Sequence, residues 1–177
     1  MFARIAALSI TLLGAGIACA QSAPGAFSIS SESIVDGKIA KAHACARQGG
    51  ENKSPHIGIS NTPEGAKYLA VIIDDPDAVP VAGKVWVHWN VFNVPAATTA
   101  IAAGTPPDGE VKNSSRSAGY EGMCPPNGVH TYRIAVFAMK DRIDAGGFFG
   151  ISPITMEKFE EKFKDVIADK ALLAGQF

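Results

Sequence analysis

Three segments of this chain carry apolar residues on both faces, and they constrain its fold more than any other feature. They read YLAVIID (68–74), KVWVHWNVFNV (84–94) and TYRIAVFAM (131–139). Short runs of this kind, bounded by loop residues, are typical of strands buried inside a sheet or sandwich. We therefore expect a mainly β domain built around these three strands.

The alternation within the second segment predicts which side chains share a face, because successive residues of a strand point to opposite sides. One face of the strand should carry Trp86, His88, Asn90 and Phe92. The opposite face should carry Val87, Trp89 and Val91. By the same rule, His130 and Tyr132 lie on one side of the third segment.

Shorter strands and loops are expected around these segments. Residues 27–39 alternate loosely and predict a first strand, interrupted at Asp36-Gly37. Residues 57–61 predict another short strand. Residues 45–56 and 95–130 are rich in Gly, Pro, Ser and Asn, and they predict long irregular connections.

The C-terminal end is the part of the sequence that predicts a helix. Ser152-Pro153 suits a helix start, because proline is favoured in the first turn. Apolar residues then recur at helical spacing opposite a charged face, namely Met156, Phe159, Phe163, and Val166 or Ile167. We interpret this stripe as core packing and expect helical elements at the end of the domain.

The first twenty residues differ from the rest of the chain. They contain one positive charge, Arg4, then an apolar run and a small-residue cleavage signal. We interpret residues 1–20 as a secretory signal peptide cleaved after Ala20. This places the mature protein, a single domain over residues 21–177, in the periplasm or outside the cell. A lipoprotein acylated at Cys19 is the alternative.

Charge and hydropathy argue against two classes of partner. The chain has 16 Lys and Arg against 17 Asp and Glu, a formal net charge of −1. It has no basic run that would indicate nucleic-acid binding. No apolar run beyond the signal is long enough to span a bilayer. We therefore expect no nucleic-acid partner and no transmembrane segment in the mature chain.

The cysteines fit an exported protein. Cleavage of the signal leaves Cys45 and Cys124, and two cysteines in an oxidising compartment usually pair. A bridge between them would stabilise the fold by roughly 4 kcal/mol. The alternative is a reactive thiol at Cys124.

Two aspartates follow directly on the first buried segment, in Asp75-Pro76-Asp77-Ala78. Taken alone, Asp and Pro at this place indicate a turn. His88 lies on the next strand, and sequential strands usually pair, so either carboxylate could approach its imidazole. Such a contact would raise the pKa of His88 and favour its charged form.

A third cluster, GYEGMCPPNGVHTY (119–132), precedes and begins the last long strand. Its glycines and prolines predict a rigid, exposed loop whose backbone N–H groups could form an anion-binding concavity. His130 and Tyr132 then project from one face of the strand. Two His, two Asp and a Tyr at the ends of three strands together indicate one pocket.

Four motifs follow one another along the chain: DPDA (75–78), WVHW (86–89), GYEGMCPP (119–126) and GVHTY (128–132). In this order they resemble the phosphatidylethanolamine-binding protein family, which includes the Raf kinase inhibitor proteins. The similarity covers roughly residues 27–177, and the chain most resembles the bacterial branch of the family.

The resemblance implies an antiparallel β-sandwich with C-terminal helical elements. It also implies a small pocket at one end that binds anions, such as phosphate or a phospholipid head group. The pocket residues that it implies are Asp75, Asp77, Trp86, His88, Pro126, His130 and Tyr132. The acids would orient an imidazole and the aromatic residues would keep water scarce, so that directed donors meet the anion.

The chain departs from the family pattern near the pocket. The family usually has a proline directly after DPDA, whereas this chain has Val79 there and its proline one residue later, at Pro80. Thr131 stands where an arginine commonly follows the second histidine, which removes one positive charge near the mouth. Met123 and His56 also differ from the usual residues. These departures concern the ligand and not the fold.

Three classes of function are open for such a site. The first is a binding module that holds a small phosphate-type anion and could modulate or inhibit another protein. The second is a hydrolase-type enzyme that uses Cys124 and His130, or the Asp/His cluster. The third is a zinc or manganese site on the same His and Asp residues. The chain has no Gly-x-Ser-x-Gly elbow and no paired metal-ligand spacing, so we favour binding without a cofactor or metal.

Overall fold

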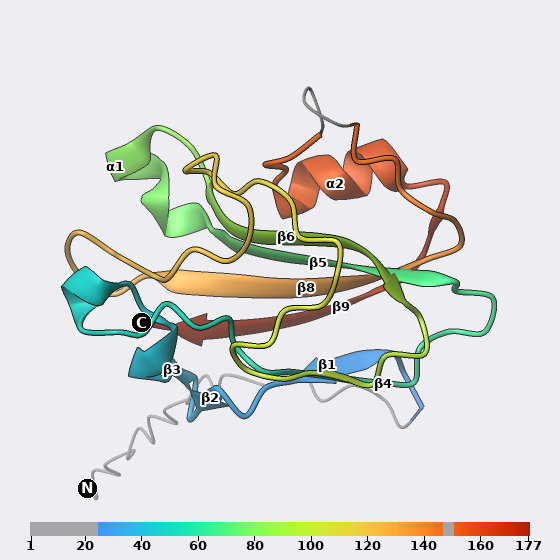
Figure 1. Cartoon of the computed structure of the whole chain (residues 1–177), viewed down its shortest axis with the longest axis horizontal. Helices are drawn as coiled ribbons and strands as arrows, with labels where there is room; N and C mark the ends of the chain where they lie inside the picture. Colours follow the sequence, from blue (N-terminus) through green and yellow to red (C-terminus); the bar gives the residue numbers. More distant parts are fainter. Residues whose placement is uncertain (1–24, 147–150) are drawn as a thin grey trace, which may run out of the picture.

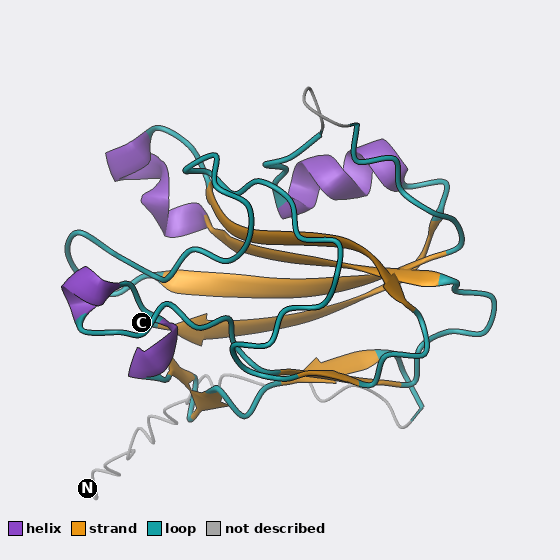
Figure 2. Cartoon of the chain, viewed as in Figure 1, coloured by secondary structure: helices purple, strands orange, loops and turns teal. Residues whose placement is uncertain are grey.

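The computed structural model describes residues 25–146 and 151–177, and the expected signal peptide lies outside these residues. In the described part, two β-sheets and a helix form three layers (Figure 1). Strands make up most of the regular structure, and the helices are short (Figure 2). The expectation of a mainly β fold is confirmed.

The larger sheet has six strands: β2 (Ile34–Val35), β3 (Lys38–Ile39), β5 (Tyr68–Asp75), β6 (Trp86–Pro95), β8 (Thr131–Met139) and β9 (Ile167–Gln176). Their order is β2-β3-β9-β8-β5-β6. Neighbours run antiparallel, except that β3 and β9 pair in parallel where Lys38 meets Gln176. The three apolar segments of the sequence form β5, β6 and β8, as expected.

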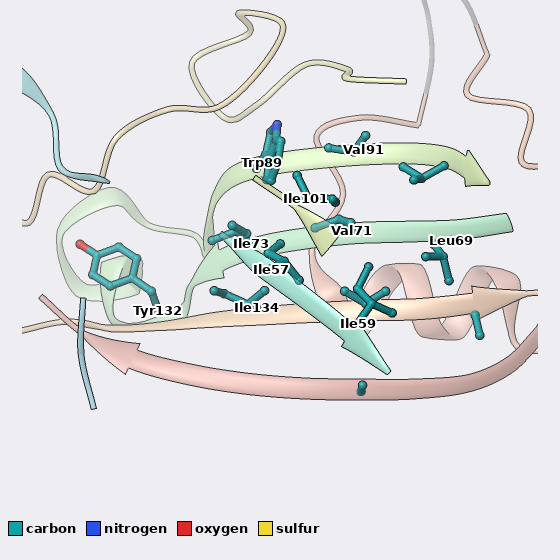
Figure 3. Close-up of a cluster of buried hydrophobic side chains, with 14 of the residues drawn as sticks. Ile57, Ile59, Leu69, Val71, Ile73, Trp89, Val91, Ile101, Tyr132 and Ile134 are labelled. Atoms are coloured by element: carbon teal, nitrogen blue, oxygen red, sulfur yellow. The ribbon is translucent and has the colours of Figure 1, made fainter. Parts of the chain in front are cut away.

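The smaller sheet covers one face of the larger sheet. It has three strands in the order β1 (Ser28–Ser30), β4 (Ile57–Ser60) and β7 (Ala100–Ile101). Ile57 and Ile59 of β4 belong to the same buried cluster as Val71 of β5 and Ile134 of β8 (Figure 3). Burial of apolar surface is the dominant favourable term in folding, so this cluster holds the two sheets together.

The first strand expected over residues 27–39 is divided into β1, β2 and β3. Asp36 and Gly37 connect β2 to β3, and both have positive φ, 49° and 75°. Two successive residues with positive φ favour a tight hairpin, because their twist matches that of the flanking strands. The interruption expected at Asp36-Gly37 is therefore a hairpin turn.

Helix α2 (Met156–Phe163) covers the opposite face of the larger sheet (Figure 1). Phe159 is fully buried there. Its ring centroid lies 5.6 Å from that of Phe92 on β6 and 4.7 Å from that of Phe137 on β8. The expected apolar stripe is thus the packing face of the helix.

The expected C-terminal helix is present as α2, but a strand follows it, and the helical spacing does not continue to Val166 or Ile167. The helix begins after Thr155, whose hydroxyl accepts a hydrogen bond from the Lys158 N–H, and not at Pro153. It ends at Phe163, and Ile167 begins β9. Antiparallel pairing with β8 along almost the whole of β9 outweighs the helical spacing of the last apolar residues.

A β-bulge in β6 changes which of its side chains share a face. Val87 and Trp89 pair with successive residues of β5, so β5 has no residue opposite His88. Bulges of this kind re-aim a side chain and are common beside binding sites. His88 consequently lies near Tyr132, with the ring centroids 5.3 Å apart.

The two faces expected for β6 are therefore wrong at its start. Trp86 pairs with Asp75 and shares its face, and His88 lies on the same side, toward the core between the sheets. Asn90 and Phe92 lie on the other face, where the Asn90 amide bonds the backbone just before α2 and Phe92 stacks on the helix. The alternation rule fails because it assumes a strand without bulges.

We predict that Phe159→Ala lowers the free energy of unfolding by about 3–5 kcal/mol, because it leaves a cavity between α2 and the sheet. Urea denaturation monitored by circular dichroism measures the change. The exposed neighbour Glu161 provides the control, and Glu161→Ala should change stability by no more than about 0.5 kcal/mol. Equal effects of the two variants would contradict the packing described for α2.

Candidate functional site

A cavity of about 270 Å³ opens at the end of the sandwich where β5 ends and where β6 and β8 begin. Five of the seven expected pocket residues line it, namely Asp75, Trp86, His88, Pro126 and His130. Asp77 and Tyr132 do not line it. The structure therefore brings most of the expected residues together around one space.

Asp75 and His130 form a buried pair beside the cavity. Asp75 Oδ2 lies 2.7 Å from His130 Nδ1, and both side chains are more than nine-tenths buried. An ionised carboxylate only accepts hydrogen bonds, so Nδ1 of His130 carries the proton. The His130 backbone also exchanges two hydrogen bonds with Phe177, of 3.0 and 3.1 Å. Asp75 thus holds the ring and Phe177 holds the backbone, and the ring keeps its Nε2 atom for other partners.

His88 has a different partner from the one expected. Its Nδ1 lies 2.8 Å from the backbone carbonyl of Glu121, and it makes no hydrogen bond to Asp75 or Asp77. Because a carbonyl only accepts, Nδ1 of His88 carries the proton. Burial lowers the pKa of His88 below 6.5, and the nearby carboxylates of Glu121 and Asp75 only partly oppose this effect. The expectation of a raised pKa and a charged His88 is therefore wrong.

Asp77 and Tyr132 support the site without lining the cavity. The Asp77 carboxylate accepts a hydrogen bond of 2.8 Å from the Thr131 N–H, so it ties the turn after β5 to the first residue of β8. Tyr132 is fully buried between the two imidazoles, at 5.3 Å from His88 and 6.4 Å from His130 by ring centroids. Burial raises the pKa of Tyr132, and nearby Asp75 adds to this, so its hydroxyl stays protonated.

Two buried polar atoms of this cluster have no partner within the described residues, Asp75 Oδ1 and Tyr132 Oη. Buried polar atoms are nearly always hydrogen-bonded, so unpaired ones in a cluster often mark a place for a ligand. One is an acceptor and the other a donor. Asp75 lines the cavity and Tyr132 does not, so Asp75 Oδ1 is the one of the two that a group in the cavity could reach.

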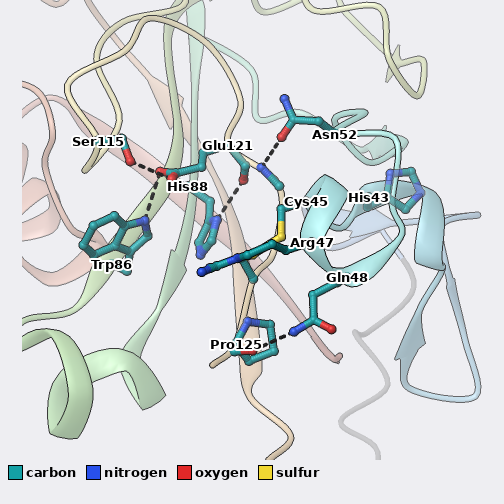
Figure 4. The surroundings of a disulfide bond; sticks show 12 residues. His43, Cys45, Arg47, Gln48, Asn52, Trp86, His88, Ser115, Glu121 and Pro125 are labelled. Atoms are coloured by element: carbon teal, nitrogen blue, oxygen red, sulfur yellow. Dashed lines mark hydrogen bonds between the residues drawn. A yellow bond between two sulfur atoms is a disulfide. The ribbon is translucent and has the colours of Figure 1, made fainter. Parts of the chain in front are cut away.

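Trp86 forms one wall of the cavity and is fixed by an acidic residue. Its Nε1–H donates to Glu121 Oε2 at 3.0 Å, and the Ser115 hydroxyl donates to the other oxygen at 2.6 Å (Figure 4). Lys84 Nζ lies 4.8 Å from the centroid of the Trp86 ring. Glu121 thus places one carboxylate on the cavity wall, and its backbone carbonyl orients His88.

Residues 109–121 run along the outer edge of β6, and they position Glu121. The N–H of Ser114 donates to the Val87 carbonyl, and the N–H of Glu121 donates to that of His88, both at 2.9 Å. Further along, the N–H of Val111 donates to the Asn90 carbonyl at 3.1 Å. The loop predicted to be irregular is thus bonded to β6 at several points.

Cys45 and Cys124 form a disulfide, with their Cα atoms 5.5 Å apart. The expected pairing is confirmed. The bond joins the loop after the short 3₁₀ helix η1 (Lys41–His43) to the pocket loop, which also pairs at the parallel bridge between Ala44 and Met123. Because the Cys124 sulfur is bonded, the free thiol required for a Cys124–His130 dyad is absent.

Gly122 allows this close approach of the two loops. A Cβ atom at this position would lie 2.6 Å from the backbone nitrogen of Cys45 and 2.7 Å from Asn52 Oδ1. The Gly122 N–H donates to Asn52 Oδ1 at 2.6 Å. This N–H is therefore already used, and it does not contribute to the backbone anion site expected in the loop.

The disulfide brings two further residues to the pocket. They belong to the 3₁₀ helix η2 (Ala46–Gln48), which directly follows Cys45. Gln48 Nε2 donates to the Pro125 carbonyl at 2.7 Å, and Arg47 Nη2 lies 3.2 Å from Cys124 Sγ (Figure 4). Arg47 also lines the cavity.

Sequence reasoning missed Arg47 and Glu121. The position of Arg47 could have been inferred from the predicted disulfide. Pairing of Cys45 with Cys124 of the pocket loop brings residue 47 close to the pocket. Glu121 lies inside the GYEGMCPP motif but was not singled out. In isolation, a charged residue in a loop predicts only a solvated surface.

In residues 25–146 and 151–177, no group of three or more His, Cys, Asp and Glu side chains is placed to hold a metal ion. In the same residues, no helix has the length and apolar character needed to cross a membrane.

The structure has a β-sandwich with an aspartate–histidine cluster at one end of its strands. The motif series in the sequence predicts this arrangement through its resemblance to one family. The profile of that family, described as "Phosphatidylethanolamine-binding protein", matches residues 30–177. Because the match covers most of the sequence, the chain belongs to this family.

Individual relatives agree with this assignment. A UPF0098 protein of Methanothermobacter thermautotrophicus is 41% identical over 115 residues, which cover 61% of this chain and 72% of that protein. The crystal structure of YbcL from E. coli, titled a new member of the mammalian PEBP family, has 27% identity and a TM-score of 0.71, covering 85% of this chain and 97% of YbcL. A putative lipoprotein of Mycobacterium tuberculosis, LppC, is 40% identical over 92 residues, 50% of this chain and 44% of LppC.

We predict that His88 titrates below its ordinary value of 6.5, as measured from its NMR signal, because its burial disfavours the imidazolium. The unfolded chain then binds this proton at a higher pH than the folded chain does. The stabilisation from neutral His88 is therefore present above about pH 6.5 and is lost as the pH falls toward the folded pKa, by at most about 1.4 kcal/mol per pH unit.

Urea denaturation between about pH 7.5 and pH 5 tests the consequence for stability. His88→Gln should lose less stability over this range than the unmodified chain. Identical slopes for His88→Gln and the unmodified chain would contradict the burial effect on His88.

Proposed function

We propose that the cavity binds a phosphate-type anion, either inorganic phosphate or the phosphate of an ester such as a phospholipid head group. The observation that carries this proposal is the arrangement of His88 and His130. Both rings line the cavity, and each has its Nδ1–H directed to a protein acceptor. The Nε2 atom is therefore the polar atom that each ring keeps for a ligand.

The two rings offer complementary partners. Neutral His88 presents an Nε2 that accepts a hydrogen bond, because its proton lies on Nδ1. Protonation of His130 makes its Nε2 a donor, and the adjacent Asp75 carboxylate compensates the charge. Hydrogen phosphate and singly protonated phosphate esters have oxygens that accept and a hydroxyl that donates. Sulfate has no donor at neutral pH, so phosphate should bind better.

The hydrolase based on Cys124 and His130 is not retained, because the Cys124 sulfur forms the disulfide. The unpaired Asp75 Oδ1 also supports binding, since Asp75 lines the cavity and this oxygen can accept a hydrogen bond from a ligand. Family membership agrees with a binding role through the name of the family, phosphatidylethanolamine-binding protein. We therefore propose a binding module.

An NMR titration of the histidine signals with inorganic phosphate, with and without a chelator, tests this function. We predict saturable shifts of His88 and His130 that do not depend on the chelator. His130→Ala should weaken phosphate binding by about 10-fold or more, because it removes a charge-assisted hydrogen bond. Sulfate should bind more weakly than phosphate.

His56→Ala is the matched control, because His56 is partly exposed and is not among the residues that line the cavity. Phosphate binding should be unchanged in this variant. If His88→Ala and His130→Ala bind phosphate as tightly as the unmodified chain does, the cavity is not the phosphate-binding site. Shifts that vanish with the chelator would indicate a metal site instead.

We also infer that the protein is exported, with cleavage after Ala20. Disulfides are typical of oxidising compartments, and the bond between Cys45 and Cys124 supports this inference. One relative, LppC, is named as a putative lipoprotein. The composition of residues 1–20 supplies the signal itself.

Expression of the full chain in a Gram-negative host tests the export. Mass spectrometry of the periplasmic fraction should find a mature chain that begins at Gln21. A mature chain that begins at a lipid-modified Cys19 would replace our inference with the lipoprotein alternative. Retention of the uncleaved chain in the cytoplasm would contradict both.

A further inference from the structure

Arg47 reaches the cavity from a segment that is remote in sequence from the strand ends and loops that form its other walls. It lies on η2, two residues after Cys45, and its side chain extends past the disulfide toward the side of the cavity where His88 lies (Figure 4). Its Nη2 donates to Cys124 Sγ at 3.2 Å, and the residue lines the cavity. The rest of the exposed guanidinium is available to a ligand.

The charges around the cavity show why this residue matters. The lining includes the carboxylates of Asp75 and Glu121 and the imidazoles of His88 and His130. Arg47 is the lone Lys or Arg among the residues that line it in the described part of the chain. When both imidazoles are neutral, removal of Arg47 leaves a wall with two carboxylates and no cation, which repels an anion.

We propose that Arg47 determines the preference of the site for doubly charged phosphate, a proposal that rests on the phosphate-binding function above. A guanidinium stays charged at all physiological pH values and can bind two phosphate oxygens in parallel.

The contacts of η2 hold this residue in place. The Cys45–Cys124 bond joins the start of η2 to the pocket loop, and the Cys45 N–H donates to the Met123 carbonyl at 3.0 Å. Gln48 binds the Pro125 carbonyl on the other side of Arg47. Contacts at Cys45 and Gln48, on either side of Arg47, thus fix the backbone that carries Arg47 to the loop that forms the cavity wall.

The test is calorimetric titration of inorganic phosphate into the unmodified chain, Arg47→Gln and Arg47→Lys, at about pH 8 and about pH 6. Inorganic phosphate is mostly doubly charged at the higher pH. There, Arg47→Gln should weaken phosphate binding by about 10- to 100-fold, the loss expected for a charged hydrogen bond. At the lower pH inorganic phosphate is mostly singly charged, so the loss should be several-fold smaller. Arg47→Lys should lose less than Arg47→Gln.

Arg116→Gln is the charge-matched control, because Arg116 is exposed and does not line the cavity. It should bind phosphate as the unmodified chain does. Equal affinity of Arg47→Gln and the unmodified chain at about pH 8, with His130→Ala still impaired, would overturn the role of Arg47 and leave the phosphate site standing. Failure of the unmodified chain to bind phosphate at either pH would overturn both proposals.

Discussion

Strand β5 ends in two buried carboxylates that point to opposite faces of the larger sheet, and the rest of the structure around the site depends on them. Asp74 accepts two hydrogen bonds from Arg133, of 2.8 and 3.0 Å, and one of 3.0 Å from the N–H of Met156 at the start of α2. Burial raises the pKa of Asp74, and these bonds oppose that rise. Asp75, one residue later, holds His130. One strand end therefore anchors the helix on one face and the candidate site on the other.

Much of the fold could be predicted from the sequence, because the segments that form β5, β6 and β8 carry apolar residues on both faces and can be recognised without knowledge of their neighbours. The strand β9 could not. Its burial alternates only at Ala171, Leu173 and Gly175, and Ile167 continues a helical stripe. Its structure comes from pairing with β8, which is information that lies outside the segment itself. Long-range pairing of this kind overrides local spacing.

The candidate site was predictable as a set of residues but not as a set of contacts. The motif series identified both histidines and Asp75. Because of the bulge at His88, however, the imidazole of His88 bonds the Glu121 carbonyl and not the expected aspartate. That exchange reverses the expected effect on the pKa of His88, since burial dominates where no carboxylate is bonded. The strand pattern does not predict Arg47 as a pocket residue, because the position of Arg47 depends on the disulfide and not on any strand.

The loop at residues 109–121 has a second consequence for the molecule. Strand β6 is the last strand of the six-stranded sheet, so its outer side would present unpaired backbone groups to other chains. The bonds from Val111, Ser114 and Glu121 occupy that side instead. Residues 109–121 therefore form part of the cavity wall and also keep the edge of β6 from pairing with a strand of another chain. Sequence changes that reshape this wall for a new ligand are constrained by the need to keep the edge of the sheet covered.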